Sequence, residues 1–256
     1  MLNRKDRLYR ELEMNVLVTQ SMLFPWIGML EQIRLADIIV HYDDVQFSKG
    51  SFTNRVQVKT NNGPRWMTVP LQHLHLGQLI DEVQVNKSSS WKEQHIALLV
   101  QSLDGAPHIR DAINIVREVY ASNYESLGAL SRASTLKLAD YFGLLQGKRV
   151  IDVRELDISG SSSGRVLEVV RAVGGDVYIT GHGARNYLDH KAFEQAGIDV
   201  RYMRYACKSY PQLWGQFTPY VTGLDLVANC AQNGIQWMTS QAIPWRDFLD
   251  QELPSQ

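Results

Sequence analysis

Cysteine is scarce in this 256-residue sequence, which contains only Cys207 and Cys230. Two thiols cannot form the disulfide framework of a small secreted protein, nor a four-cysteine zinc site. We therefore expect a reduced, cytoplasmic setting, in which both thiols are packed side chains, and we assign no metal.

Long hydrophobic runs are also missing, because no stretch approaches the roughly 20 apolar residues that a membrane-spanning helix needs. Residues 1–13 carry charges of both signs and lack the apolar segment of a signal peptide. We predict no membrane insertion and interpret residues 1–13 as an N-terminal extension. Either Met1 or Met14 could be the natural start.

Neither sign of charge predominates: the sequence contains 26 Lys and Arg residues and 27 Asp and Glu residues, for a net charge of -1. A chain without a basic excess has no global field to attract nucleic acid, so we expect no nucleic-acid partner. Its 45% hydrophobic content is enough for a substantial core. No linker rich in Pro, Gly or Ser divides the sequence, and we predict a single domain over residues 14–256.

The hydrophobic pattern opens with a βαβ unit. A buried strand is predicted at residues 14–19, a helix after Pro25 at residues 27–35, and a second strand at residues 38–40. A right-handed crossover makes the two strands parallel neighbours. Side chains that directly follow them then lie at the carboxyl edge of the sheet, where open α/β proteins usually bind ligands.

The remaining pattern predicts a mixed α/β fold with a mostly parallel sheet. A β-hairpin is expected at residues 56–69, and helical spacing follows at about residues 89–143. Alternating strands and helices resume over residues 150–203. The sheet is therefore predicted to be interrupted by an inserted hairpin and a helical segment.

Polar side chains follow both strands of the opening unit: Gln20 after the first, and Asp43 and Asp44 after the second. A carboxylate at this edge could act as a general base, hold a metal or only brace the loop. Because adjacent strand residues point to opposite faces, Asp43 and Asp44 are not expected to form one dyad.

Lys49, Asn54 and Arg55 come next in the sequence. Arginine grips phosphate through two parallel hydrogen bonds and lysine acts as a point charge, so these residues are candidates for holding a phosphorylated substrate. The alternative is an internal ion pair of Lys49 or Arg55 with Asp43 or Asp44.

A turn containing Gly181, His182 and Gly183 follows a later strand, with Arg185 nearby. Glycines allow close approach of the backbone to a phosphate, and His182 could act as an acid or base. The alternative is a histidine that satisfies local backbone groups. The turn matches neither of the glycine-rich loops typical of ATP and dinucleotide binding.

Three further features complete the candidate site. Trp26 could stack on a sugar or base ring. Asp225 lies between two leucines and needs a partner if it points inward. Tyr210 and Gln212 supply polar groups shortly before it.

Taken together, these residues resemble the WbqC-like protein family. The resemblance covers about residues 14–234 and rests on Gln20, Phe24-Pro25-Trp26, Gly28, Ala36-Asp37, Asp43-Asp44-Val45-Gln46-Phe47, Lys49, Asn54-Arg55, Trp66, Thr68-Val69-Pro70, Gly181, Gly183, Tyr187-Leu188-Asp189, Phe193, Tyr210-Pro211-Gln212, Leu224-Asp225-Leu226 and Asn229. It implies that one pocket is lined by Gln20, Asp43, Asp44, Lys49, Asn54, Arg55, Gly181, Gly183, Tyr210, Gln212 and Asp225. Ser21 departs from the proline that often follows the glutamine in this family.

A fainter resemblance links the βαβ unit to the nucleotidyltransferase-like α/β fold. Residues 25–29 contain the glycine of that fold's His-x-Gly-His helix start but neither histidine. The likeness therefore favours the fold more than ATP chemistry.

The family resemblance implies an acyl or aminoacyl transferase that acts on the amine of a nucleotide-linked amino sugar in surface-polysaccharide biosynthesis. Asp43, Asp44 or His182 would be the base, with a CoA-linked or carrier-linked acyl donor, or ATP. Two alternatives stay open: an adenylate-forming amino-acid ligase and a non-catalytic scaffold of a biosynthetic complex. The sequence also leaves a homo-oligomer open.

Overall fold

The computed structural model describes residues 13–87 and 90–250. Its central sheet consists of β1 (Asn15–Thr19), β2 (Ile38–His41), β7 (Arg149–Asp152), β8 (Val177–Thr180), β9 (Asp199–Arg204) and β10 (Gln241–Pro244). The strand order is β10-β9-β8-β1-β2-β7, and β10 alone is antiparallel to its neighbour within this sheet. The predicted α/β class with a mostly parallel sheet is confirmed.

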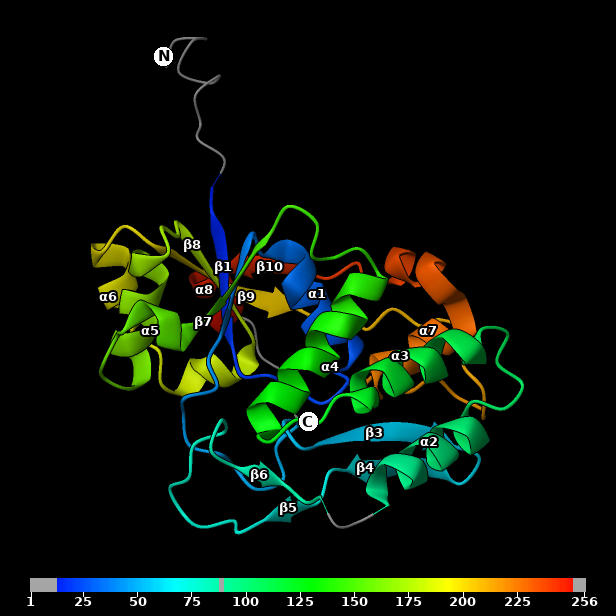
Figure 1. Cartoon of the computed structure of the whole chain (residues 1–256). Helices are drawn as coiled ribbons and strands as arrows, with labels where there is room; N and C mark the ends of the chain where they lie inside the picture. Colours follow the sequence, from blue (N-terminus) through cyan, green and yellow to red (C-terminus); the bar gives the residue numbers. More distant parts are fainter. Residues whose placement is uncertain (1–12, 88–89, 251–256) are drawn as a thin grey trace.

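Two short hairpins lie outside this sheet. They are formed by β3 (Arg55–Thr60) with β4 (Gly63–Thr68) and by β5 (Leu71–Gln72) with β6 (Gln84–Val85). The first hairpin is the inserted one that the alternating valines predicted. In Figure 1 it lies below the central sheet, beside α2 (Trp91–Ser102).

The remaining helices are α1 (Ile27–Leu35), α3 (Ile109–Ala121), α4 (Leu127–Tyr141), α5 (Ser162–Ala172), α6 (His190–Gln195), α7 (Gly223–Cys230) and α8 (Trp245–Leu249). Helices α2, α3 and α4 form the predicted helical segment, of which residues 88–89 lie outside the described residues. Among the described helices, none is both long and apolar enough to cross a membrane.

Both faces of the sheet are buried, and successive strand residues alternate between them. Leu17 and Ile39 belong to the core that contains α1, α7 and the inserted helices. Val16 and Val40 belong to the opposite core, which contains α5, α6 and α8. Helices on both sides explain why the strands are nearly continuous apolar runs rather than alternating ones.

The chain changes direction across the sheet next to β1. It runs from β1 through β2 to β7 on one side, then crosses to β8 on the other side of β1 and continues to β9. The helix after β1 and the helix after β8 lie on opposite faces. The carboxyl ends of β1 and β8 therefore border a topological switch point, where α/β proteins commonly bind ligands. We use the name switch crevice for this position in the strand order.

The difference in burial between the centre and the edge of the sheet can be tested with a pair of residues that lie directly opposite each other on neighbouring strands. Ile39 of β2 pairs with Val150 of β7, but Ile39 is 0% exposed and Val150 is 40% exposed. We expect Ile39→Ala to lower the free energy of unfolding by about 2–5 kcal/mol, because it leaves a cavity in the core. Val150→Ala should change it by only about 0.5 kcal/mol. Equal losses in urea denaturation would contradict the layered arrangement.

Candidate functional site

Asp43 is the centre of a buried ion-pair network at the carboxyl ends of β2 and β7. Its carboxylate accepts hydrogen bonds from the backbone N–H of Ser21 at 2.7 Å and from the Ser21 hydroxyl at 2.6 Å. Arg132 of α4 donates to Asp43 at 2.8 Å and to Asp152 at 2.5 Å. Arg154 donates to Asp152 from the other side, at 2.5 Å. These bonds join the segment after β1 to β2, β7 and α4.

Ser21, His41 and Asp43 meet in this network, but they do not form a hydrolytic triad. The Ser21 hydroxyl lies 2.9 Å from Nδ1 of His41 and donates to Asp43, whereas in a triad the carboxylate holds the histidine. Burial lowers the pKa of His41 to about 4, and its Nε2 has no hydrogen-bond partner among the described residues. Because Ser21 is 1% exposed, its hydroxyl is not accessible to a substrate. The trio holds the end of β1 in place.

Asp81 is a third carboxylate in this network, and it lies near both arginines. It lies 3.4 Å from Arg154 and 3.7 Å from Arg132, and burial, together with the nearby Asp43 charge, raises its pKa. A Cβ on Gly128 would lie 2.1 Å from its Oδ1, so a glycine is needed in α4 at this contact. Burial alone would raise the pKa of Asp152, but hydrogen bonds from Arg154 and Arg132 hold it well below its usual range.

Asp44 points to the opposite face of the sheet and has its own partner. Arg165 of α5 donates to both carboxylate oxygens, at 2.8 and 2.5 Å, and lies over the Tyr42 ring at 4.8 Å. Asp43 and Asp44 therefore form no dyad, in agreement with strand alternation. Within the described residues, neither pairs with Lys49 or Arg55, so the alternative of such internal ion pairs is wrong.

Of the three polar residues before and at the start of β3, Asn54 and Arg55 contact the hairpin. Arg55 donates to the Gly50 carbonyl at 2.8 Å and lies over the Trp66 ring at 4.1 Å. Asn54 is buried and donates to the Val69 carbonyl at 3.3 Å. Lys49 is exposed. Their roles in substrate binding stay predictions.

Asp225 belongs to a second buried network, which holds the irregular residues 205–222. Tyr210 donates to its carboxylate at 2.8 Å, and Gln212 donates to the Tyr210 hydroxyl at 2.8 Å. Lys59 of β3 donates to the Gln212 side chain at 2.9 Å. The structure thus brings Tyr210, Gln212 and Asp225 together. Burial raises the pKa of Asp225 to about 6 and lowers the pKa of Lys59.

His182 lies in the switch crevice, at the start of the short 3-10 helix His182–Asn186. Its Nε2 is 2.8 Å from the Met203 carbonyl, and its ring contacts Tyr205 at 5.1 Å and Phe248 at 5.0 Å. A carbonyl can only accept, so Nε2 carries the proton and Nδ1 presents a lone pair. The imidazole is therefore held in the orientation and tautomer that a general base requires.

Tyr205 connects the switch crevice to the start of α1. Its hydroxyl accepts a hydrogen bond from Gln32 of α1 at 2.7 Å, and a Cβ on Gly181 would lie only 3.1 Å from it. The Tyr205 ring also contacts Trp26, at 5.0 Å between ring centroids. Gly181, His182 and Trp26 thus share Tyr205 as a neighbour. The sequence prediction missed this tyrosine, whose one signal is its place directly after a strand.

Gln20, Gly183 and Arg185 complete the surroundings of the crevice. All three are exposed, Gln20 directly after β1 and the other two on the 3-10 helix after β8. Gln20 therefore follows one of the two strands that border the crevice, and Gly183 and Arg185 follow the other.

The predicted site residues thus fall into separate groups rather than one connected cluster. Asp43 and Asp44 have different arginine partners on opposite faces, and the Asp225 network shares no hydrogen bond or ion pair with either of them among the described residues. The group at the switch crevice consists of Gln20, Trp26, Gly181, His182, Gly183 and Arg185. It combines access to solvent with an oriented imidazole, and it is the best candidate for chemistry.

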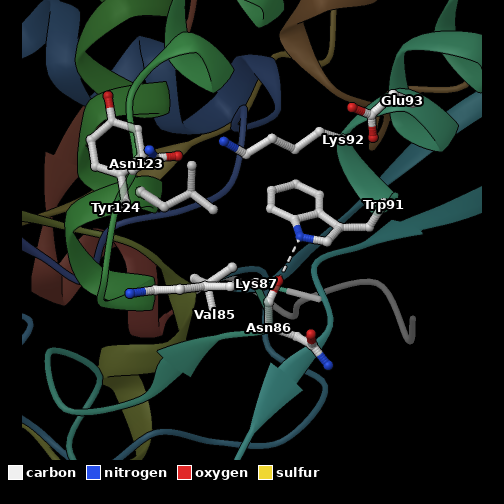
Figure 2. A pocket seen from close by; sticks show the side chains of 9 residues that line it. Val85, Asn86, Lys87, Trp91, Lys92, Glu93, Asn123 and Tyr124 are labelled. Atoms are coloured by element: carbon white, nitrogen blue, oxygen red, sulfur yellow. Dashed lines mark hydrogen bonds between the residues drawn. The ribbon is translucent and has the colours of Figure 1, made fainter. Parts of the chain in front are cut away.

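A cavity of about 410 Å³ lies elsewhere, beside α2 (Figure 2). Val85, Asn86, Lys87, Trp91, Lys92, Glu93, Asn123, Tyr124 and Leu130 line it. Figure 2 shows the Trp91 indole donating to the Asn86 carbonyl, at 3.0 Å. The Lys92 ammonium donates to the Tyr120 carbonyl at 2.7 Å at the end of α3. None of the predicted site residues lines this cavity.

The Asp43 network predicts a large effect of one uncharged replacement. Asp43→Asn keeps the shape but leaves the half-buried Arg132 with less compensating charge, and we expect the free energy of unfolding to fall by about 3–5 kcal/mol. Asp104→Asn, at an exposed position, is the control and should be nearly neutral. Urea denaturation measures both. A loss below about 1 kcal/mol for Asp43→Asn would show that this pair contributes no more than a surface ion pair.

The raised pKa of Asp225 predicts a pH-dependent stability. Folded Asp225 binds its proton up to about pH 6, whereas its ordinary pKa is 3.8, so this group stabilises the fold as the pH falls between these values. The stability of the wild type relative to Asp225→Asn should rise by about 2 kcal/mol from pH 7.5 to pH 4.5.

Denaturation of both proteins at both pH values measures this difference. His41 and His95, whose pKa values burial lowers to about 4, act in the opposite direction, but they are present in both proteins and cancel. A difference that does not change with pH would contradict a protonated Asp225.

A family model and a curated protein each match most of this chain. Residues 20–237 match the model of the WbqC-like protein family. The "Uncharacterized protein Rv1507c" of Mycobacterium tuberculosis is 28% identical over 219 residues, which cover 84% of this chain and 93% of that protein. No solved structure matches significantly, so the nucleotidyltransferase-like likeness is not confirmed. On the extent of the family match, the chain belongs to the WbqC-like protein family.

Proposed function

We propose that this protein transfers an acyl or aminoacyl group to the amine of a nucleotide-linked amino sugar in surface-polysaccharide biosynthesis. The substrate class follows from the family resemblance. The observation that carries the chemistry is His182, which a backbone carbonyl holds at the switch crevice with Nδ1 as the lone-pair nitrogen. Gln20 and Gly181 follow the two strands that border the same crevice.

His182 fits the role of base better than Asp43 or Asp44. Asp43 is completely buried and accepts from both Ser21 and Arg132, and Asp44 accepts two hydrogen bonds from Arg165. A carboxylate whose oxygens already accept strong donors is a poor acceptor for a substrate proton. In this proposal the two aspartates are positioning residues, and the imidazole takes the proton.

The proposed step forms an amide bond. The amine nitrogen attacks the carbonyl carbon of a thioester donor, which is CoA-linked or carrier-linked, and the C–S bond breaks. His182 Nδ1 accepts the proton that the amine loses and returns it to the departing thiolate. Backbone N–H groups of the turn at Gly181 and Gly183, with the Arg185 side chain, would hold the phosphates of the acceptor.

The proposal predicts a product and a residue dependence. The purified protein, incubated with UDP- and dTDP-linked amino sugars and a panel of acyl and aminoacyl thioesters, should form an N-acylated sugar nucleotide that mass spectrometry detects. His182→Gln should lower kcat by about 10²–10⁴-fold, because a positioned acid–base group contributes this much. His75→Gln is the matched control, since His75 lies on an exposed loop, and it should retain the activity.

Three outcomes would contradict the proposal. One is the absence of product with every pair of donor and acceptor. Another is exchange of labelled pyrophosphate into ATP that depends on an amino acid, which would favour the ligase alternative. The last is intact output of the polysaccharide pathway in cells that carry His182→Gln, which would favour a scaffold.

A further inference from the structure

We propose that Trp26, Tyr205 and Tyr220, here called the aromatic cradle, form the binding site for the nucleobase of the acceptor. This inference rests on the proposed function and adds which part of the acceptor is recognised and where. The Trp26 ring contacts both of the others, with centroid distances of 5.0 Å to Tyr205 and 5.4 Å to Tyr220. Aromatic side chains that stack on bases are the usual means of binding nucleotides without reading a sequence.

The start of α1 is shaped to accommodate the Trp26 indole. A Cβ on Gly28 would lie 2.2–2.5 Å from three carbons of that ring, which real side chains essentially never do. The indole therefore lies flat against the first turn of α1, where any residue other than glycine would displace it. The same position lies at the carboxyl edge of β1, next to the switch crevice.

A narrow cavity of about 10 Å³ with a mostly apolar lining adjoins Trp26, and it is too small to hold a base, so the base would stack on the exposed side of Tyr220. The cavity is lined by Trp26, Ile27, Gly28, Glu31, Cys207, Lys208, Phe217, Pro219 and Trp237. Tyr220, which contacts Trp26 but is not part of this lining, is 50% exposed. A large aromatic side chain that remains half-exposed beside an apolar cavity can bury further surface against a planar ring.

One cation, Lys208, and one carboxylate, Glu31, line this cavity. Lys208 is exposed, lies over the Trp237 ring at 4.9 Å and forms no ion pair with a carboxylate of the described residues. The one carboxylate in the lining, Glu31, already accepts the backbone N–H and the hydroxyl of Ser240, at 2.8 and 2.6 Å. The ammonium of Lys208 is therefore available as a further contact for the diphosphate, in addition to the turn at Gly181 and Arg185 proposed above. Planar ring and diphosphate together define a nucleoside diphosphate.

Tyr205 links this base site to the proposed chemistry. Its ring contacts Trp26 on one side and His182 on the other, at 5.0 and 5.1 Å. A base held by the cradle would direct its sugar along the carboxyl edge of the sheet toward His182. The cradle would then supply affinity and the crevice would supply the reacting groups.

Isothermal titration calorimetry with UDP, dTDP and GDP tests the cradle without any acyl donor. We expect Tyr220→Ala to weaken binding of the preferred diphosphate by about tenfold or more, as loss of one base-stacking ring does. Tyr220→Phe keeps the ring and should bind like the wild type. Phe52→Ala removes another exposed aromatic side chain, on the loop before β3, and should leave the affinity unchanged.

The outcomes separate this inference from the proposed function. Wild-type affinity in Tyr220→Ala, an equal loss in Tyr220→Phe, or no binding of any of the three diphosphates would overturn the cradle. Equal kcat/KM for glucosamine 1-phosphate and UDP-glucosamine would also overturn it, while leaving the transferase intact. Binding of a diphosphate that depends on Tyr220, without turnover of any amino sugar, would support the cradle and contradict the transferase.

Discussion

The ion pair between Asp43 and Arg132 is the interaction on which the rest of this structure depends. It connects the end of β2 to α4, and through Ser21 and Asp152 it also fixes the ends of β1 and β7. A completely buried carboxylate is costly unless its partners satisfy it, and here every partner is supplied by a different element. The carboxyl edge of the sheet is therefore rigid on this side.

A second buried network holds another irregular segment. The Asp225 network attaches residues 205–222 to β3 and α7 through Tyr210, Gln212 and Lys59. The segment after β1 and the segment after β9 are both irregular, and both are held by buried polar groups. Trp26 comes from the first segment, and Tyr205 and Tyr220 come from the second. Two structural networks thus define the position of an aromatic surface that belongs to neither of them.

The sequence was sufficient for the main fold because its hydrophobic periods are clear. The opening βαβ unit, the hairpin and the helical segment all follow from apolar spacing and turn residues. Strand β10 and helices α7 and α8 were not predicted, since their short segments lack a strong period. That the side chains of Asp43 and Asp44 point to opposite faces of the sheet followed from strand alternation alone.

The arginine partners of Asp43 and Asp44 could not be predicted from the sequence. Arg132 is 89 residues away from Asp43, and Arg165 is 121 residues away from Asp44. Each lies in a helix whose hydrophobic pattern indicates nothing about an ion pair. The sequence therefore suggests the nearby Lys49 and Arg55 as partners instead. Tyr205 was missed for the same reason, because its contacts with Trp26 and His182 arise only when β8 and β9 are placed beside β1.

Hydrogen–deuterium exchange with and without UDP-glucosamine tests the central claim, that ligands bind at the switch crevice and the cradle. The account predicts slower exchange at residues 20–28, 181–187 and 205–222, which come from three separate parts of the sequence. Slower exchange confined to the cavity beside α2, at residues 90–93 and 123–130, would contradict it.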